Sequence, residues 1–517
     1  MKRETITGLM LTLLLVGMLT LAFNIQSVTA ALSVHNIDTG EDFATIQEAI
    51  NDPDTLDGHT ILVDAGTYYE DIRINKTLTL QGENRETTII HGSGFGIDVE
   101  GIDVDSPHVS ISGFTIENAF YGIFVFAGAH YSTITDNIVS SNKYGIYVGH
   151  YSHYATIANN TVTDNSEEGI SVWTSNSSTL VNNIVSNNGI GIHIDGSPGF
   201  VLRNNSMTDN GYNLFISDYN IDPSIGHDID PSNTVNGKPV YYWINRKDET
   251  VPSDAGYVCI VSSINITVRE LNLVNNGQGV LFVNTTNSLI ANVNSSNNWW
   301  ACIDLSRGSS YNTIINNTVS NAYYGLLIDS SHNTISDNII TNSSTGISLV
   351  GANFTVRGNT VTDNECGITL QTGSGNTTVY HNNFINNTEQ AVCKLVRNTW
   401  DNGYPSGGNY WSDHNPPDVY SGPYQNETGR DEIGDEAYVI NMYNKDRYPL
   451  IYPYGYVPSP DLNGDGTVNI LDVILLANSF GSDPGHPNWN PEADLNKDGM
   501  INIFDAILIA GNFGKTS

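Results

Sequence analysis

The chain has 517 residues and a formal net charge of −35, although charged residues make up only 15% of it. Nucleic acids and anionic membranes bind through basic patches, so this balance argues against both as partners. Four cysteines are too few for a disulfide scaffold and match no zinc spacing, so we expect buried free thiols, with one disulfide as the alternative. They are Cys259, Cys302, Cys366 and Cys393.

Residues 1–30 are typical of a secretory signal peptide. Lys2 and Arg3 precede an apolar run from Leu9 to Phe23, and small residues at 28–30 offer a cleavage site, with an uncleaved anchor as the alternative. No later stretch is apolar for long enough to span a bilayer, so we expect no transmembrane segment after cleavage. The sequence therefore predicts a secreted, extracellular protein associated with the cell surface, and it leaves the oligomeric state open.

Helical spacing marks residues 43–50, with Asp42 or Thr45 as the candidate N-cap. We expect this helix to belong to an N-terminal cap over residues 41–60, followed by a first strand at residues 60–63. Such a cap is needed where a stack of strands begins, because an uncovered strand edge would pair with other chains.

From about residue 95 to 395 the chain repeats itself every 21 to 25 residues. The unit reads roughly T-I-x-x-N-x-V-S-x-N-x-x-G-I-x-V, as in STITDNIVSSNKYGIYV from Ser132 and ATIANNTVTDNSEEGISV from Ala155. Isolated Ile and Val alternate with Thr, Ser and Asn, which is the pattern of short strands. A period near 22 with three such strands per unit is typical of a solenoid. Asn marks the register at positions 137, 160, 183, 205, 292, 317, 338, 359 and 383.

The predicted fold class is mainly β, with a right-handed parallel β-helix of about a dozen coils within residues 31–454. We expect ladders of Asn side chains along the stacked coils, and Gly and Asn at the corners, because both tolerate left-handed backbone. An insertion at residues 213–256 interrupts the repeat and holds an Asn236-Gly237 hairpin turn. It is either a binding face or a β-decoration on the flank of a coil. Residues 398–454, rich in Gly, Pro and Tyr, are the predicted C-terminal cap.

After a linker at residues 455–460, one calcium-loop pattern appears twice within residues 461–517, in register and 33 residues apart. Each loop has side-chain oxygens at positions 1, 3, 5, 9 and 12, a backbone carbonyl at position 7, and Gly at position 6. We expect a small α-helical module that binds two Ca²⁺ ions, with two solvated Asx-turns as the alternative. The predicted ligands are Asp461, Asn463, Asp465, Thr467, Asn469 and Asp472 in the first loop, and Asp494, Asn496, Asp498, Met500, Asn502 and Asp505 in the second.

Catalytic residues are harder to identify, because no active-site motif matches. A glycoside hydrolase needs grouped carboxylates, and a polysaccharide lyase needs an Arg or Lys base. The carboxylates at positions 98, 100, 103 and 105 alternate with Ile and Val, so we expect an ordinary solvated strand face there. The candidates are Asp98, Glu100, Asp103, Asp105, Glu167 and Glu168, with Arg203, Arg269, Arg307 and Arg357 as bases. Whether the protein is an enzyme is left open.

Histidines and exposed aromatic residues offer two further kinds of site. By repeat register His130 and His153 occupy the same place in successive coils, with His150 close by, and they are the best copper candidates. A stacked surface pair is the alternative. Aromatic rows on a β-helix flank suit sugar faces. The candidates for glycan contact are Trp173, Trp243, Trp299, Trp300, Tyr323 and Tyr324, with corner or groove packing as the alternative for each.

Several longer motifs resemble known families. FATIQEAI followed by GHTILVDAGTYYEDIRINKTLTLQG resembles the right-handed β-helix proteins of the pectate-lyase-like superfamily, and NTVNGKPVYYW with GGNYWSDH resembles their NosD-type subfamily. The latter resemblance implies periplasmic copper binding or processing. The tail from Asp461 to Gly514 resembles a type I dockerin, which implies two calcium ions and docking to a cohesin. Loop positions 10 and 11, usually small and polar in that family, are apolar here and suit either a cohesin or the chain's own β-helix. The predicted docking residues are Ile470, Leu471, Ile503 and Phe504.

Three functions follow from these observations. The first is an exported calcium-binding β-helix that contacts polysaccharide or a cell-surface glycan and docks through its tail to a cohesin or surface partner. The second is a polysaccharide-processing enzyme (lyase, glycoside hydrolase or epimerase) on the same flank. The third is a copper-binding protein of the NosD type. Clustered carboxylates, with or without Arg, in a groove would favour the second, and three converging imidazole or thiol ligands would favour the third.

Overall fold

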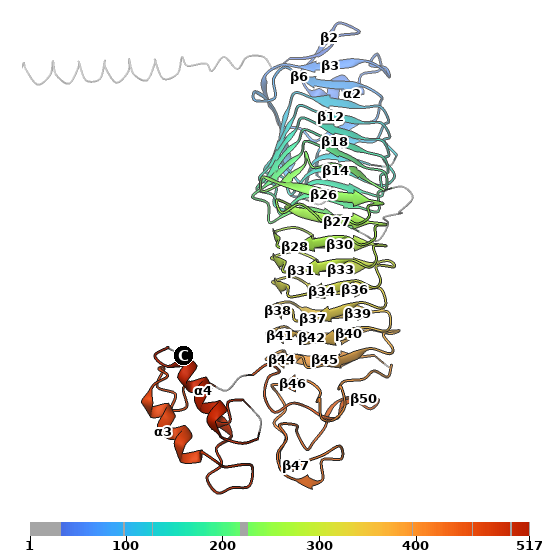
Figure 1. Ribbon diagram of the computed structural model, residues 1–517. Coiled ribbons are helices and arrows are strands. Elements are labelled where there is room, and N and C mark those ends of the chain that lie inside the picture. Colours follow the sequence, from blue (N-terminus) through green and yellow to red (C-terminus); the bar gives the residue numbers. More distant parts are fainter. Residues whose placement is uncertain are drawn as a thin grey trace, which may run out of the picture. The chain divides into compact units, whose positions relative to one another are not determined.

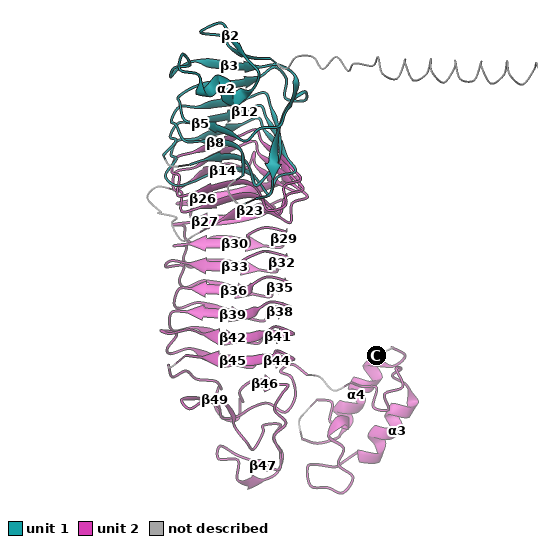
Figure 2. Cartoon of the chain, turned by 180° about the vertical axis from the view of Figure 1, so that it is seen from behind, with its two compact units in different colours: residues 1–161 teal, residues 162–517 magenta. Residues whose placement is uncertain are grey.

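The chain forms two compact units, residues 1–161 and residues 162–517, which Figure 2 distinguishes by colour. The computed structural model describes residues 33–96, 99–126, 128–217, 226–394, 396–456, 459–496 and 499–515. Outside the described residues lie the predicted signal peptide, Asp98, Asp498, residues 218–225 of the insertion and residues 457–458 of the linker.

The first described residues of unit 1 form a short cap. Strands β1 (Val34–Asn36) and β2 (Glu41–Phe43) pair antiparallel, and helix α2 (Ile46–Asn51) follows. Thr45 caps this helix, because its hydroxyl accepts a hydrogen bond from the backbone N–H of Glu48 at 3.2 Å. The helix thus begins directly after one of the two residues predicted as its N-cap.

The other strands of unit 1 run parallel in three stacks, with three strands to each turn. Successive strands of a stack come from successive turns, so Ile102, Ile123 and Ile146 lie in register and are buried. The strands are β3 (Thr60–Val63), β4 (Gly66–Tyr68), β5 (Ile72–Ile74), β6 (Thr79–Gly82), β7 (Thr88–Gly94), β8 (Glu100–Val104), β9 (Ser110–Ser112), β10 (Thr115–Ala119), β11 (Tyr121–Val125), β12 (Thr133–Thr135), β13 (Ile138–Ser140), β14 (Tyr144–Val148) and β15 (Thr156–Ala158).

Unit 2 repeats this plan, and Figure 1 shows strands such as β30, β33, β36 and β39 lying one beside the next. Its strands are β16 (Thr161–Thr163), β17 (Glu168–Trp173), β18 (Thr179–Val181), β19 (Ile184–Ser186), β20 (Ile190–Asp195), β21 (Val201–Arg203), β22 (Ser206–Thr208), β23 (Tyr212–Ile216), β24 (Asp228–Ile229), β25 (Thr234–Val235), β26 (Lys238–Ile244), β27 (Tyr257–Val261), β28 (Thr267–Arg269), β29 (Asn272–Val274), β30 (Gln278–Val283), β31 (Leu289–Ala291), β32 (Asn294–Ser296), β33 (Ala301–Ser306), β34 (Thr313–Ile315), β35 (Thr318–Ser320), β36 (Tyr324–Asp329), β37 (Thr334–Ser336), β38 (Ile339–Thr341), β39 (Thr345–Val350), β40 (Thr355–Arg357), β41 (Thr360–Thr362), β42 (Cys366–Leu370), β43 (Thr378–Tyr380), β44 (Asn383–Ile385), β45 (Glu389–Cys393), β46 (Tyr410–Trp411), β47 (Tyr420–Ser421), β48 (Glu427–Thr428), β49 (Tyr438–Asn441) and β50 (Asn444–Asp446), with helices α3 (Ile470–Ser479), η2 (Pro491–Ala493) and α4 (Ile503–Asn512) near its end.

The fold is therefore mainly β, a right-handed parallel β-helix, as predicted. The chain makes about 15 solenoid turns, whereas the sequence predicted about a dozen. The difference arises where the repeat is weak. The turns built from residues 60–94 and 228–261 lie outside the marker positions named above, although Asn233 continues the Asn ladder and parallel pairing holds from β3 to β6, from β4 to β7 and from β26 to β27.

Buried Asn side chains form the predicted ladders, as the turns around Asn338 show. Asn338 Nδ2 donates to Asn359 Oδ1 at 2.9 Å, and Asn317 Nδ2 donates to Asn338 Oδ1 at 2.9 Å. Asn338 Nδ2 also donates to the carbonyl of Ile314 at 3.0 Å. These side chains are buried, and a buried polar group without a hydrogen-bond partner would destabilise the fold. Each hydrogen bond of the ladder avoids that cost.

Two positions of the predicted ladder were wrong by one residue. Asn382, and not Asn383, continues the ladder, since its Oδ1 accepts from Asn359 Nδ2 at 2.8 Å. One turn before Asn317 the ladder position belongs to Val293, and not to Asn292, because the Val293 N–H donates to Asn317 Oδ1 at 2.9 Å. At the first place two adjacent Asn residues fit the repeat equally, and at both places only the backbone pairing shows which residue holds the ladder position.

The described part of the insertion continues the solenoid. Strands β25 and β26 form an antiparallel hairpin around Asn236 and Gly237, whose φ angles of 49° and 76° suit the expected tight turn. Strand β26 then pairs parallel with β27 from Val240 to Ile244. This segment therefore adds a strand to the parallel sheet.

Two buried tryptophans and one carboxylate close the C-terminal end of the β-helix. Trp400 and Trp411 are almost completely buried, and β46 pairs parallel with β44. Asp446 accepts hydrogen bonds from the indole Nε1 of Trp411 at 3.0 Å and from the backbone N–H of Asn409 at 2.7 Å. The hairpins β47–β48 and β49–β50 follow.

Candidate functional site

A groove of about 650 Å³ opens on the face of unit 1 formed by strands β5, β8 and β11. The repeated pattern x-Gly-Ile-x-Val builds it. The Ile and Val side chains point inward and are buried, so the residues before Gly and after Ile point outward. Gly122 cannot be replaced without movement, because a Cβ there would lie 2.6 Å from Val139 Cγ1 and 2.8 Å from the carbonyl oxygen of Gly145.

The outward residues form two columns along the stacked strands. The first column, in register, is Arg73, Asp103, Phe124 and Tyr147, and the second is Glu100, Tyr121 and Tyr144. Each column therefore changes from charged to aromatic residues from one turn to the next. The groove is lined by Arg73, Glu100, Asp103, Asp105, Tyr121, Phe124 and Phe126.

The aromatic half of the groove is a set of stacked rings. The ring of Tyr121 stacks on that of Phe124 with centroids 4.6 Å apart, and on that of Tyr144 at 5.0 Å. The rings of Phe124 and Tyr147 have centroids 5.3 Å apart. Phe124 also stacks on Phe126 at 5.0 Å, so the rings form one continuous apolar surface that a sugar ring can contact.

The charged half of the groove is organised around Arg73. Its Nε donates to Asp105 Oδ2 at 2.6 Å, and the same nitrogen lies 3.7 Å from Asp103 Oδ2. Asp103 Oδ1 is buried and accepts no hydrogen bond from the described residues. Burial, followed by the negative charges of Asp105 and Glu100, raises the pKa of Asp103 to about 6, although Arg73 acts in the opposite direction.

The solvated strand face expected for these carboxylates is therefore wrong for Asp103. Its side chain is only 21% exposed and that of Asp105 only 18%, because the aromatic rings of the next turn stand beside them. Sequence reasoning named the carboxylates but missed Tyr121, Phe124 and Tyr147. The signal was present: EGIDV, YGIFV and YGIYV place acidic and then aromatic residues at the same repeat positions.

The two predicted calcium loops are near the end of unit 2. In the first, Asp461 accepts hydrogen bonds from the backbone N–H of Gly466, and Asp472 accepts them from the N–H of Asn463 and of Asn469. Asp461 and Asp472 are buried. Gly466, at loop position 6, has a φ of 86°, which favours glycine. The loop thus folds around two buried carboxylates.

The second loop repeats this arrangement. Asp505 accepts from the N–H groups of Asn496 and Asn502, and Asp494 accepts from the N–H of Gly499. Asp494 and Asp505 are buried as well. Oxygen donors repeated at this spacing fit a hard cation such as Ca²⁺. The remaining predicted ligands are Asp465, Thr467 and Met500, together with Asp498, which lies outside the described residues.

Helices α3 and α4 follow the loops and pack through a small apolar core. Asn469 and Asn502 cap them, each in a capping box with the aspartate three residues later. The predicted docking residues are at the first two positions of each helix and point to solvent. Their exposed fractions are 59% for Ile470, 50% for Leu471, 57% for Ile503 and 60% for Phe504.

The copper candidates form the stacked pair that was the alternative. The rings of His130 and His153 are 5.3 Å apart at 15°, and His130 Nδ1 accepts the backbone N–H of His153 at 3.1 Å. His150 packs against Phe126, with ring centroids 4.3 Å apart. Within the described residues these three histidines do not form a compact three-ligand group.

The predicted glycan-contacting residues form two clusters in unit 2, and Trp243 lies apart from both, near Tyr241. Trp300 stacks on Tyr323 at 5.6 Å and 6°, and Tyr324 contacts both rings. Trp173 and Trp299 approach the buried His193, whose Nδ1 lies 2.8 Å from Glu168 Oε1. Sequence reasoning did not single out His193.

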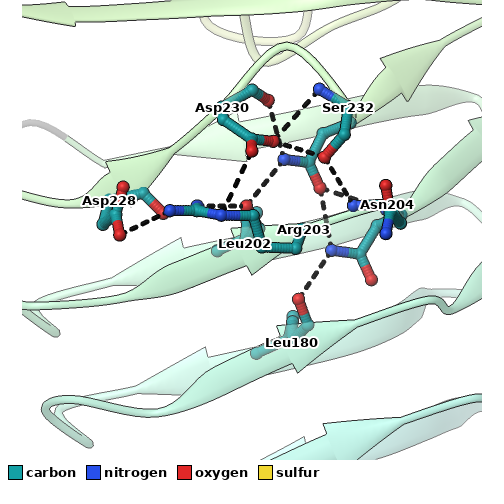
Figure 3. Close-up of polar contacts among 9 residues, drawn as sticks. Leu180, Leu202, Arg203, Asn204, Asp228, Asp230 and Ser232 are labelled. Carbon is teal, nitrogen blue, oxygen red and sulfur yellow. Dashed lines mark hydrogen bonds and ion pairs between the residues drawn. The ribbon is translucent and has the colours of Figure 1, made fainter.

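Arg203, a candidate lyase base, is neutralised by two carboxylates. Its guanidinium lies 2.5 Å from Asp228 and 3.1 Å from Asp230, and it also donates to the backbone carbonyls of Leu202 and Asp228, as Figure 3 shows. Ser232 closes the network by donating to Asp230. A guanidinium held in this way cannot readily release a proton to act as a base.

All four cysteines are free thiols, with only Cys366 partly exposed.

Both parts of the chain match known families. A parallel β-helix followed by a paired calcium-loop module defines the class of protein. The chain belongs to the family described as "Periplasmic copper-binding protein (NosD)", which matches residues 55–227 and 232–416. A dockerin type I domain matches residues 459–513. Among the described residues, no helix is both long and apolar enough to cross a membrane.

Individual relatives are more distant. A "Cell surface glycoprotein" of Methanothermus fervidus is 33% identical over 127 residues, which are 25% of this chain and 21% of that protein; the match thus spans about a fifth of the relative's length. The A-module of the Azotobacter vinelandii mannuronan C-5 epimerase AlgE6 is 15% identical with a TM-score of 0.30, covering 66% of this chain and 90% of that one. Pectin methylesterase PemA of Erwinia chrysanthemi is 14% identical with a TM-score of 0.27, covering 47% and 77%.

Proposed function

We propose that this protein is exported, binds polysaccharide in the groove of unit 1, and docks through its calcium-loaded dockerin domain to a cohesin-type or cell-surface partner. The observation that carries the proposal is the groove itself, in which stacked rings adjoin hydrogen-bonding carboxylates. Residues 1–30 and the cell-surface relative support export and surface association.

The groove has the composition expected of a sugar-binding site. A volume of about 650 Å³ is within the range of ordinary ligand sites. Tyr121 and Phe124 supply apolar ring surface, while Glu100 and Asp105 supply acceptors for hydroxyl groups. The stacked pair Trp300 and Tyr323 in unit 2 is a second candidate contact, because Tyr323 is 51% exposed.

Calcium would be held by the two loops of the dockerin domain. Each loop gathers two buried aspartates and several Asn or Asp oxygens, which is the donor chemistry that Ca²⁺ prefers. Bound calcium would offset the charge of these carboxylates and fix the starts of α3 and α4. The apolar pairs Ile470-Leu471 and Ile503-Phe504 would then be presented to the partner on these helix starts.

A glycan array probed with the secreted full chain tests sugar binding. We expect binding to at least one polysaccharide and a loss of about tenfold in affinity for Tyr121→Ala, which corresponds to one stacked sugar ring. Tyr69→Ala is the matched control, since Tyr69 is 78% exposed and lies outside the groove. Absence of binding to every polysaccharide would reject this part of the proposal.

Docking is tested by capture of the full chain on immobilised cohesin modules in calcium and in excess chelator. We expect calcium-dependent capture that is lost when Leu471 and Phe504 are both changed to Asp. The matched control is Val439→Asp, because Val439 is 67% exposed on β49 and outside the dockerin domain. Capture that persists in chelator would contradict the calcium part of the proposal.

Copper binding is the second candidate function, favoured by the description of the family. His130 and His153 would supply imidazole ligands from successive turns, although their stacked arrangement does not itself form a coordination site. Copper titration followed by calorimetry should show one site that is lost in His130→Ala and kept in His332→Ala, a control in unit 2. Equal binding by the two variants would exclude this pair.

A further inference from the structure

We propose that the groove of unit 1 hydrolyses glycosidic bonds of an uncharged polysaccharide, with Asp103 as the proton donor to the leaving oxygen. This inference rests on the proposed sugar-binding role of the groove and adds both the reaction and the class of substrate. Asp103 touches the reacting atoms in this scheme and is therefore a catalytic residue.

The geometry places sugar-stacking and proton-transferring groups in one column. Asp103 and Phe124 are direct neighbours in register on β8 and β11. The spacing between adjacent strands is about 4.8 Å, so a sugar ring that contacts Phe124 lies within reach of the carboxyl group one strand away. Tyr121 beside Glu100 repeats the same step in the second column.

The charges of the groove select against acidic polysaccharides. Three carboxylates line it, Glu100, Asp103 and Asp105, against one cation, Arg73. Arg73, which lines the groove, already pairs with Asp105, so a uronate carboxylate would enter a site of net negative charge. The overall charge of −35 acts in the same direction. A neutral glycan carries no such penalty.

The charges that line the groove also favour hydrolysis over β-elimination. Elimination needs a substrate carboxylate, a cation that neutralises it and a base, and the groove offers only the engaged Arg73. Hydrolysis needs two carboxyl groups in different protonation states, one acid and one base. Asp105 accepts a hydrogen bond from the Arg73 guanidinium at 2.6 Å, whereas Asp103 is further from it, at 3.7 Å, and has one oxygen fully buried.

The reaction balances with water as the co-reactant. Asp103 gives its proton to the glycosidic oxygen as the bond from that oxygen to C1 breaks. The oxygen of a water molecule forms the new bond to C1, and its proton passes to the Asp105 carboxylate. Asp103 regains a proton from solvent and Asp105 returns one, so the enzyme is unchanged. The pKa of Asp103, about 6, leaves it protonated in mildly acid solution.

The test uses the full secreted chain with soluble polysaccharides and measures new reducing ends. The uncharged probes are mixed-linkage β-glucan, galactomannan and xylan, and the acidic probes are polygalacturonate and alginate. Asp103→Asn and Asp105→Asn are compared with Asp136→Asn, a matched control at an exposed corner of unit 1. Binding of each variant is measured alongside, which separates loss of chemistry from loss of fold.

We expect cleavage of an uncharged polysaccharide at pH 5 that falls as the pH rises through about 6. Asp103→Asn should lose at least a hundredfold in rate and keep its affinity within threefold, while Asp136→Asn stays active. Binding without cleavage by the unmodified protein, or full activity of Asp103→Asn, would overturn the inference and leave the binding role intact. Cleavage of the acidic probes alone would overturn it as well. Absence of binding would reject the binding role and the inference together.

Discussion

Arg73 donates a hydrogen bond to Asp105 across one turn of unit 1, over a distance of 2.6 Å and a separation of 32 residues. The Arg73 side chain is 70% exposed, so this pair adds little to the free energy of unfolding. Its effect is electrostatic and local. The pairing with Asp105 places the positive charge of Arg73 3.7 Å from a second carboxylate, that of Asp103.

Removing this positive charge should raise the pKa of Asp103 further. In Arg73→Met the attraction that lowers this pKa is gone, while burial and the charges of Asp105 and Glu100 still raise it. Carbon-13 NMR of labelled aspartate, followed through a pH titration, measures the change. Arg85→Met is the control, because Arg85 pairs with Glu86 outside the groove. An unchanged or lowered pKa would show that Arg73 does not act on Asp103.

The stability of unit 1 should depend on pH through Asp103. Its folded pKa of about 6 is above the unfolded value of about 4, so the folded state holds the proton more tightly. The resulting stabilisation is complete below about pH 4 and is lost as the pH rises through about 6. Asp103→Asn, which stays neutral, should therefore match the unmodified protein at pH 4 and be about 2 kcal/mol more stable at pH 8.

Hydrogen exchange of the β8 and β11 amides at both pH values measures this difference in unit 1. Asp136→Asn serves as the control, since its carboxylate is exposed. Equal protection of Asp103→Asn and the unmodified chain at pH 8 would contradict the prediction.

Breaking one rung of the Asn ladder should be costly. Asn338→Ala removes hydrogen bonds to Asn317, Asn359 and Ile314 and leaves buried amide groups without partners. We expect a loss of about 2–4 kcal/mol in the free energy of unfolding. Thr318→Ala, an exposed substitution on the neighbouring β35, should cost less than about 1 kcal/mol. Denaturant unfolding compares the two, and similar costs would argue against the ladder.

Each calcium loop should bind one ion independently of the other loop. Asp472→Asn and Asp505→Asn each remove one of the two buried carboxylates in a loop, so each should reduce the bound calcium from two ions to one. Calorimetric titration of the full chain counts the ions. Asp483→Asn, an exposed position between the helices, should still bind two. Two ions in Asp472→Asn would show that the first loop binds calcium without its last ligand.

The solenoid could be predicted because its period is carried by local sequence. Isolated Ile and Val residues between polar neighbours specify short strands, and their spacing specifies stacking. The exact ladder register could not be read at Asn382 and Asn383, since two adjacent Asn residues satisfy the pattern equally. Only the pairing of Thr360 with Asn383 in the parallel ladder decides which side chain points inward.

The groove could be predicted only in part, because it depends on contacts between turns. Alternation showed correctly that Asp103 points outward from β8. Its partial burial comes from Phe124 and Tyr121, which are supplied by the next turn of the solenoid, and its charge partner Arg73 comes from the turn before. The strand pattern alone describes each turn separately, so it could not give the depth of the groove or the raised pKa.

The Trp411–Asp446 hydrogen bond at the C-terminal cap has a mechanical consequence. If the protein is tethered by its tail, tension on it first reaches the β-helix where Tyr454 and Asn383 hydrogen-bond each other, and then reaches the cap residues from Asp446 back to Trp400. Two buried indole rings and a carboxylate that also binds the Asn409 N–H hold this cap together. This cap would then set the force that the tethered molecule withstands, and the turns behind it would unravel one at a time.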